Sequence, residues 1–85
     1  MKRLVQGLES LEKINILLSM TSIKSDVIKT ALTRHYVYGW NDEHVIESLS
    51  IDSSNFKRAD KKLNEYADKF VRLCEIEGLV KKSVK

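Results

Sequence analysis

Residues that break regular backbone structure are almost absent from this chain. It has no proline and three glycines among its 85 residues. Strand-rich folds need frequent turns, and those turns are usually built with these two residue types. Helical folds need fewer turns, because each helix carries many residues between one turn and the next. The scarcity of breakers therefore predicts an all-α fold of helices joined by short turns.

Size and composition predict one small domain spanning residues 1–85. Hydrophobic residues make up 42% of the chain and charged residues 32%, a balance typical of a folded domain rather than a disordered one. A small domain buries a limited share of its surface, which favours oligomerisation. Cys74 has no second cysteine to pair with, and no segment approaches the roughly 18 apolar residues of a membrane span. We therefore expect a cytoplasmic protein without disulfides or membrane association.

Hydrophobic spacing and capping residues predict about four helices. The first carries a leucine stripe that starts at Leu4, and it ends near Met20. The second is expected over roughly residues 24–38, and Gly39 stops it. The third is short and begins after Asn41, a good capping residue.

The fourth helix is expected to be much longer than the others. It begins at Asp52 or Ser53 and can run to Glu77, where Gly78 stops it. At 1.5 Å per residue such a helix spans about 37 Å. The short basic tail at residues 80–85 is expected to be mobile.

Two apolar stripes compete as the surface through which copies of the chain associate. One lies in the first helix and contains Leu8, Leu11 and Leu18. The other lies late in the fourth helix and contains Phe70, Leu73 and Ile76. The late stripe has fewer partners within the chain, so we predict that it is the oligomerisation surface.

Residues 42–63 have the apolar spacing of a helix-turn-helix unit. The inner positions are Val45, Ile46, Leu49, Ile51, Phe56 and Ala59. Two positions depart from the usual pattern, because Ile46 replaces a small residue and Ser50 replaces a glycine. An ordinary helical hairpin has the same spacing and remains the alternative.

The outer face of the second helix of this unit is polar and cationic. Its members are Ser53, Ser54, Asn55, Lys57, Arg58, Lys61 and Lys62. Asparagine and arginine can contact base edges with two hydrogen bonds, whereas lysine and serine more often bind phosphate. The pattern predicts binding of double-stranded DNA, with base contacts from Ser54, Asn55 and Arg58 and phosphate contacts from the cations. A face that is simply solvated remains the alternative.

A distinctive sequence, Thr21-Ser22-Ile23-Lys24-Ser25-Asp26, precedes the second helix. Together with the turn at residues 36–39, Val45 and the stretch 54–63, this sequence resembles the PapB family of adhesin (fimbrial) biosynthesis transcription regulators. The resemblance covers residues 21–63 and needs no gap. The resemblance implies a bacterial protein of the cytoplasm and nucleoid that binds A·T-rich duplex DNA as an oligomer. The chain departs from the family at Asp42, Glu43 and His44, where PapB-like sequences tend to carry basic residues.

No catalytic, metal or cofactor site is predicted. His35, His44 and Cys74 are the candidate soft metal ligands, and no two of them have a ligand-pair spacing. The chain also lacks a glycine-rich phosphate loop and a recognisable nucleophile setting. We expect a transcription regulator that is neither an enzyme nor a binder of small-molecule substrates. The alternative is a helical adaptor that binds another regulator through its acidic third and long fourth helices and does not touch DNA.

Overall fold

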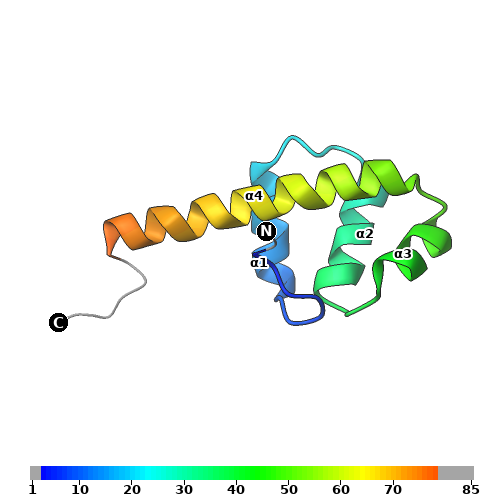
Figure 1. Cartoon of the computed structure of the whole chain (residues 1–85), viewed down its shortest axis with the longest axis horizontal. Coiled ribbons are helices and arrows are strands. Elements are labelled where there is room, and N and C mark those ends of the chain that lie inside the picture. The colour runs from blue at the N-terminus through cyan, green and yellow to red at the C-terminus, as the bar shows by residue number, and fades with distance from the viewer. Residues whose placement is uncertain (1–2, 79–85) are drawn as a thin grey trace.

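Four α-helices make up most of residues 3–78, the part of the chain that the structure describes (Figure 1). The computed structural model describes residues 3–78, with α1 at Leu11–Met20, α2 at Asp26–Tyr36, α3 at Asp42–Leu49 and α4 at Ser53–Glu77. Within those residues no strand occurs. The predicted all-α fold, with four helices and a long C-terminal one, is confirmed. The basic tail predicted at residues 80–85 lies outside the described residues.

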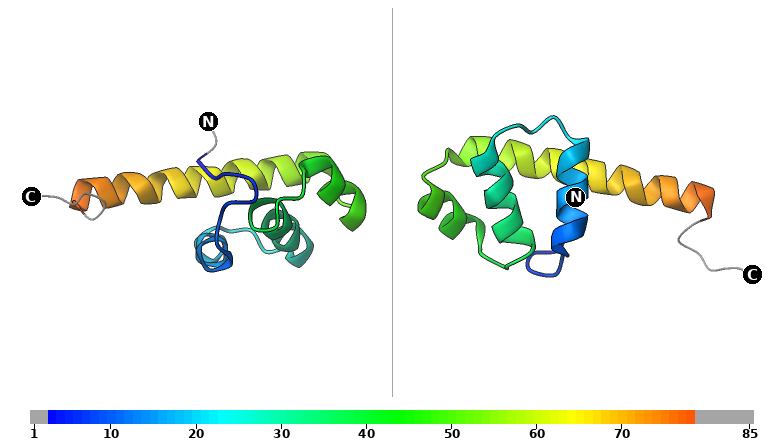
Figure 2. Two further views of the ribbon diagram at one scale, coloured as in Figure 1. Left: turned by 90° about the horizontal axis from the view of Figure 1, so that it is seen from below. Right: turned by 180° about the vertical axis from the view of Figure 1, so that it is seen from behind.

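The helix α2 is the central element, in contact with each of the other three helices. The helix α4 lies across α1 and α2, and its C-terminal half extends beyond them (Figure 2). The molecule is consequently elongated, with extents of 49 × 23 × 22 Å. No helix in the described part of the chain is long and apolar enough to cross a membrane.

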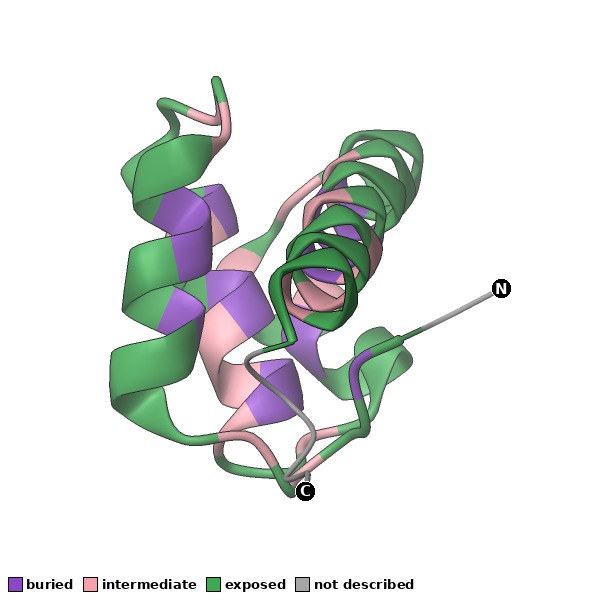
Figure 3. Cartoon of the chain, turned by 90° about the vertical axis from the view of Figure 1, so that its left-hand side faces the viewer, coloured by how far each residue is buried: buried purple, intermediate pink, exposed green. Residues whose placement is uncertain are grey.

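The buried residues lie on the helix faces that are turned toward neighbouring helices, and the outward faces are exposed (Figure 3). Every helix contributes to this core, whose largest fully buried members are Ile14, Leu32, Tyr36, Val45, Phe56 and Leu63. Both Phe56 and Leu63 belong to the first half of α4. That half is therefore fixed by packing, which also fixes the direction of its outer face.

Side-chain caps decide where the first three helices begin. The side chains of Ser10, Ser25 and Asn41 each accept a hydrogen bond from an amide in the first turn that follows. The start predicted for α3 is confirmed. The helix α2 is shorter than the predicted range of 24–38, because Ser25 caps it and its last helical residue is Tyr36.

The first half of the predicted N-terminal helix is wrong, because α1 begins at Leu11. Gly7 has a φ of +76°, and a Cβ added to it would lie 3.0 Å from the Cα of Gly39. The chain thus turns tightly against the α2–α3 connection. As a result Leu8 and Leu11 are exposed, and the predicted leucine stripe does not form one continuous helical face.

The N-terminal segment instead completes the end of α2. The amides of Gly7 and Glu9 donate to the carbonyl oxygens of His35 and Tyr36, at 3.2 and 3.1 Å. Carbonyls at a helix C-terminus have no partner within the helix, so these bonds satisfy groups that α2 leaves open.

A buried polar cluster joins the N-terminal segment to α2 and α4. The Tyr36 hydroxyl donates to the Asp60 carboxylate, and Asn64 Nδ2 donates to the Tyr36 oxygen at 2.9 Å. The Asn64 Oδ1 accepts the amides of Arg3 and Leu4, each at 2.8 Å. Burial, together with the hydrogen bond to Asp60, raises the pKa of Tyr36 above its ordinary value. The cluster therefore fixes α4 to α2 through neutral Tyr36 and fixes the N-terminal segment to α4.

Candidate nucleic-acid interface

The residues predicted to contact DNA all lie in the first half of α4, and all of them are exposed: Ser53, Ser54, Asn55, Lys57, Arg58, Lys61 and Lys62. Ser54, Arg58 and Lys61 recur at spacings of four and three, so they form one stripe along the helix. Phe56 and Leu63 point the other way, with exposed fractions of 1% and 0%. The predicted residues are thus brought together on the outward face of a well-packed helix.

The amino end of α4 differs from those of the other helices. Its cap residue, Asp52, makes no side-chain capping hydrogen bond. The first amides of α4 therefore have no side-chain acceptor from the cap, and they stand at the positive end of the helix dipole. Amides in this position suit a phosphate oxygen.

Two of the predicted base-contacting residues are already bonded to each other. The Arg58 guanidinium donates to Asn55 Oδ1, one turn earlier in the helix. The bond holds Arg58 toward the start of α4 and uses one acceptor site of Asn55. Contact of Asn55 with an adenine edge would use the same oxygen, which has two acceptor sites.

The connection between α1 and α2 extends the polar surface beside α4. Lys62 Nζ donates to Ser22 Oγ at 3.1 Å, although the two residues are 40 positions apart in sequence. Exposed Lys24 belongs to the same connection and adds a cation that is not among the predicted DNA contacts. The only sequence signal for it is its place in the Thr21–Asp26 segment that resembles the PapB family.

The turn between α3 and α4 has three residues, Ser50, Ile51 and Asp52. Ser50 has φ 53° and ψ 45°, the left-handed region where glycine is usual in this turn. The Ile51 amide donates to the Ile46 carbonyl at 3.1 Å, and both side chains pack against the core. Ser50 thus adopts the left-handed backbone conformation that glycine adopts in the usual turn. This conformation is strained for a residue with a Cβ atom.

The helix α3 presents a negative surface at the other side of the turn. Asp42, Glu43 and Glu47 are exposed, and among the described residues none of the three forms an ion pair. Acidic side chains at a helix start stabilise the helix dipole. They also repel phosphate, so any DNA contact would have to come from α4 rather than from the start of α3.

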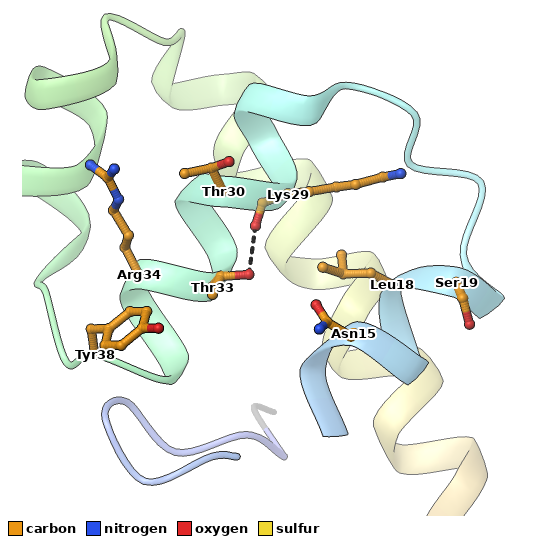
Figure 4. Close-up of a pocket in the computed structure, with 8 residues that line it drawn as sticks. All are labelled: Asn15, Leu18, Ser19, Lys29, Thr30, Thr33, Arg34 and Tyr38. Carbon is orange, nitrogen blue, oxygen red and sulfur yellow. Dashed lines mark hydrogen bonds between the residues drawn. The ribbon is translucent and has the colours of Figure 1, made fainter. Parts of the chain in front are cut away.

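A cavity of about 490 Å³ lies between α1 and α2 (Figure 4). Its lining includes the cations Lys29 and Arg34 but no carboxylate. Figure 4 shows the two charged groups pointing to opposite ends of the cavity. Arg34 instead lies over the Trp40 ring, 4.9 Å from its centroid. The cations therefore do not converge on one anion. Within the described residues, no group of three acidic, histidine or cysteine side chains could hold a metal ion.

The residues of the predicted oligomerisation surface are exposed on the extended half of α4. Phe70, Leu73 and Ile76 have exposed fractions of 50%, 59% and 77%. Large apolar side chains that lie exposed along one stretch of a helix are typical of an interaction surface.

These features define the class: a small all-α protein with a helix-turn-helix arrangement, α3–turn–α4, and a long C-terminal helix. Among solved structures, the chain is similar to that of FocB from E. coli. The TM-score is 0.80 at 25% sequence identity, and the match covers 86% of this chain and 83% of the FocB chain. FocB is a fimbrial regulator of the PapB family and is not an enzyme. The predicted resemblance to that family and the predicted fold class are therefore confirmed.

The likeness rests on the structural comparison, because no protein-family model and no curated protein sequence match the chain.

Proposed function

We propose that this protein is a bacterial transcription regulator of a fimbrial operon that binds A·T-rich duplex DNA as an oligomer in the cytoplasm. The observation that carries the proposal is the stripe of Ser54, Arg58 and Lys61 on the outward face of α4. The similarity to FocB supports the regulatory role.

The proposed roles follow from side-chain chemistry and position. Lys57 and Lys62 lie at the two sides of the stripe, where they would reach phosphates of opposite strands along a groove. Lys61 adds a third phosphate contact. Arg58 and Asn55, near the amino end of α4, are proposed to contact base edges together with Ser54.

The proposed oligomer uses the exposed apolar end of α4, with Phe70, Leu73 and Ile76. One copy offers a short recognition surface, and linked copies bind neighbouring half-sites more tightly than separate ones. Loss of oligomerisation should therefore weaken DNA binding even when α4's amino end is intact.

A salt titration tests the proposal. Fluorescence anisotropy would measure binding to an A·T-rich duplex and to a random duplex of equal length, between about 0.05 and about 0.2 M salt. Phosphate contacts predict a straight fall of log affinity with log salt, by at least tenfold over this range, with the A·T-rich duplex bound more tightly. Undetectable binding at the lowest salt would contradict the proposal.

A helical adaptor is the second candidate, and the acidic surface of α3 favours it. Asp42, Glu43 and Glu47 have no partner ions among the described residues and could face the cations of another protein. This candidate predicts no affinity for either duplex. The anisotropy titration therefore separates the two functions.

A further inference from the structure

The connection between α1 and α2, residues 21–25, is held in place at both of its ends. The Thr21 hydroxyl donates to the Leu18 carbonyl at 2.9 Å, and the Ile23 amide donates to Thr21 Oγ1 at 3.2 Å. The partly buried Ile23 side chain packs against the core, and Ser25 caps α2. These contacts give the connection a defined path between the two helices.

Two polar side chains of the connection face outward beside α4. Ser22 and Lys24 are exposed, whereas Ile23 between them packs inward. This alternation is that of an extended segment, in which residues two apart share a side. Lys62 of α4 lies at the same place, because its Nζ donates to Ser22 Oγ at 3.1 Å. The fold therefore brings the cations Lys24 and Lys62 to one edge of α4.

Both of these cations can bind an anion. Neither Lys24 nor Lys62 forms an ion pair within the described residues. Lys62 gives one of its three N–H donors to the neutral Ser22 hydroxyl, so its charge is not neutralised and two donors remain. The acid at the end of this segment, Asp26, stands in the first turn of α2, where the helix dipole partly offsets its charge.

The place of this edge beside α4 determines which part of a duplex it would meet. A helix with its side chains is about 10 to 12 Å across, and the wider groove of B-DNA is about 12 Å wide. A helix that presents its outer face to the bases therefore occupies the whole width of the groove. A segment packed beside that helix lies over the sugar-phosphate backbone, where lysine side chains bind phosphate oxygens.

We propose that Lys24 and Lys62 bind phosphates of the same DNA strand, and that Ser22 positions the Lys62 ammonium for this contact. The connection between α1 and α2 is then a second DNA-contacting element, outside the helix-turn-helix unit. This inference rests on the proposed binding of DNA by α4 and adds a backbone contact at one side of that helix.

A salt titration of Lys24→Ala tests the added contact with the A·T-rich and random duplexes. Phosphate contacts carry no base sequence information, so the affinity for both duplexes should fall severalfold and by the same factor. Loss of one phosphate contact should also make the log–log salt slope smaller by about 1. Lys29→Ala is the matched control, since Lys29 lines the cavity between α1 and α2 (Figure 4) and not the edge of α4. It should keep the wild-type affinity and slope.

The outcomes of this titration separate the inference from the proposed function. A wild-type slope in Lys24→Ala, or equal changes in Lys24→Ala and Lys29→Ala, would overturn the inference and leave DNA binding by α4 standing. A wild-type protein that binds neither duplex would overturn both.

A double-mutant cycle tests the positioning role of Ser22. Ser22→Ala should weaken binding when Lys62 is present, because it removes the oxygen that accepts the Lys62 bond. It should change the affinity by less than about twofold in the Lys62→Ala background, where there is no ammonium to position. A structural effect of Ser22→Ala on the connection would weaken binding equally in both backgrounds. Equal losses, or no loss in either background, would therefore overturn the role of Ser22.

Discussion

Replacement of Asn64 by alanine tests the buried cluster that anchors the N-terminal segment. Asn64→Ala leaves the amides of Arg3 and Leu4 without their acceptor. A buried donor without a partner costs about 1 to 3 kcal/mol, and the partly buried Arg3 amide belongs at the lower end of that range. Alanine recovers about 0.5 kcal/mol through its higher helix propensity. We expect the free energy of unfolding to fall by about 2 to 3 kcal/mol.

Urea unfolding followed by circular dichroism measures the change, at one protein concentration because association contributes to stability. Asn55→Ala is the matched control, with the same substitution on the same helix at an exposed position. It should change the free energy of unfolding by no more than about 0.5 kcal/mol. A loss below about 1 kcal/mol in Asn64→Ala, or equal losses in both variants, would refute the anchoring role.

Three further predictions concern the turn, the buried tyrosine and the oligomer. Ser50→Gly should raise the free energy of unfolding by about 0.5 to 1 kcal/mol by relieving the left-handed backbone, whereas Ser48→Gly within α3 should lower it similarly. Urea unfolding in which both substitutions shift the free energy of unfolding in the same direction would contradict the strain at Ser50. The pKa of Tyr36 is raised above its ordinary value of 10.0, so at high pH the folded chain keeps the Tyr36 proton while the unfolded chain loses it. The contribution of Tyr36 to the free energy of unfolding is therefore complete below about pH 10 and decreases above it. Urea unfolding at about pH 8 and about pH 11 should show a smaller loss of stability for Tyr36→Phe than for the wild type. An identical loss in the two proteins would contradict a raised pKa at Tyr36. Phe70→Asp with Leu73→Asp should sediment as a folded monomer and bind DNA more weakly, and a persistent dimer would exclude this surface.

The bounds of α4 could be predicted because they depend on local sequence. The helix runs from Ser53 to Glu77, between Asp52 and Gly78, as the capping pattern indicates. The start of α1 could not be predicted in the same way. Gly7 turns against Gly39, a contact between residues 32 positions apart that no local pattern encodes.

The outer face of α4 could be predicted from periodicity, because Phe56 and Leu63 define the inner face. The same periodicity did not identify Asp60 and Asn64 as buried, with exposed fractions of 7% and 4%. Polar residues at such positions are buried only when a partner satisfies them, and here the partner is Tyr36, 24 and 28 positions away. The cation Lys24 was missed for a similar reason, since only the folded chain brings its connection beside Lys62.

The central claim, that the first half of α4 binds DNA, is tested most directly by the salt dependence of a double variant. Lys57→Ala with Arg58→Ala is compared with Lys69→Ala with Arg72→Ala, which removes the same two residue types from exposed positions later in α4. Anisotropy titration of the A·T-rich duplex should show binding weakened at least tenfold in the first variant, with a log–log salt slope smaller by about 1 to 2. The second variant should keep the wild-type slope. Equal affinities and slopes in the two variants would contradict the assignment of α4's amino end as the DNA-binding surface.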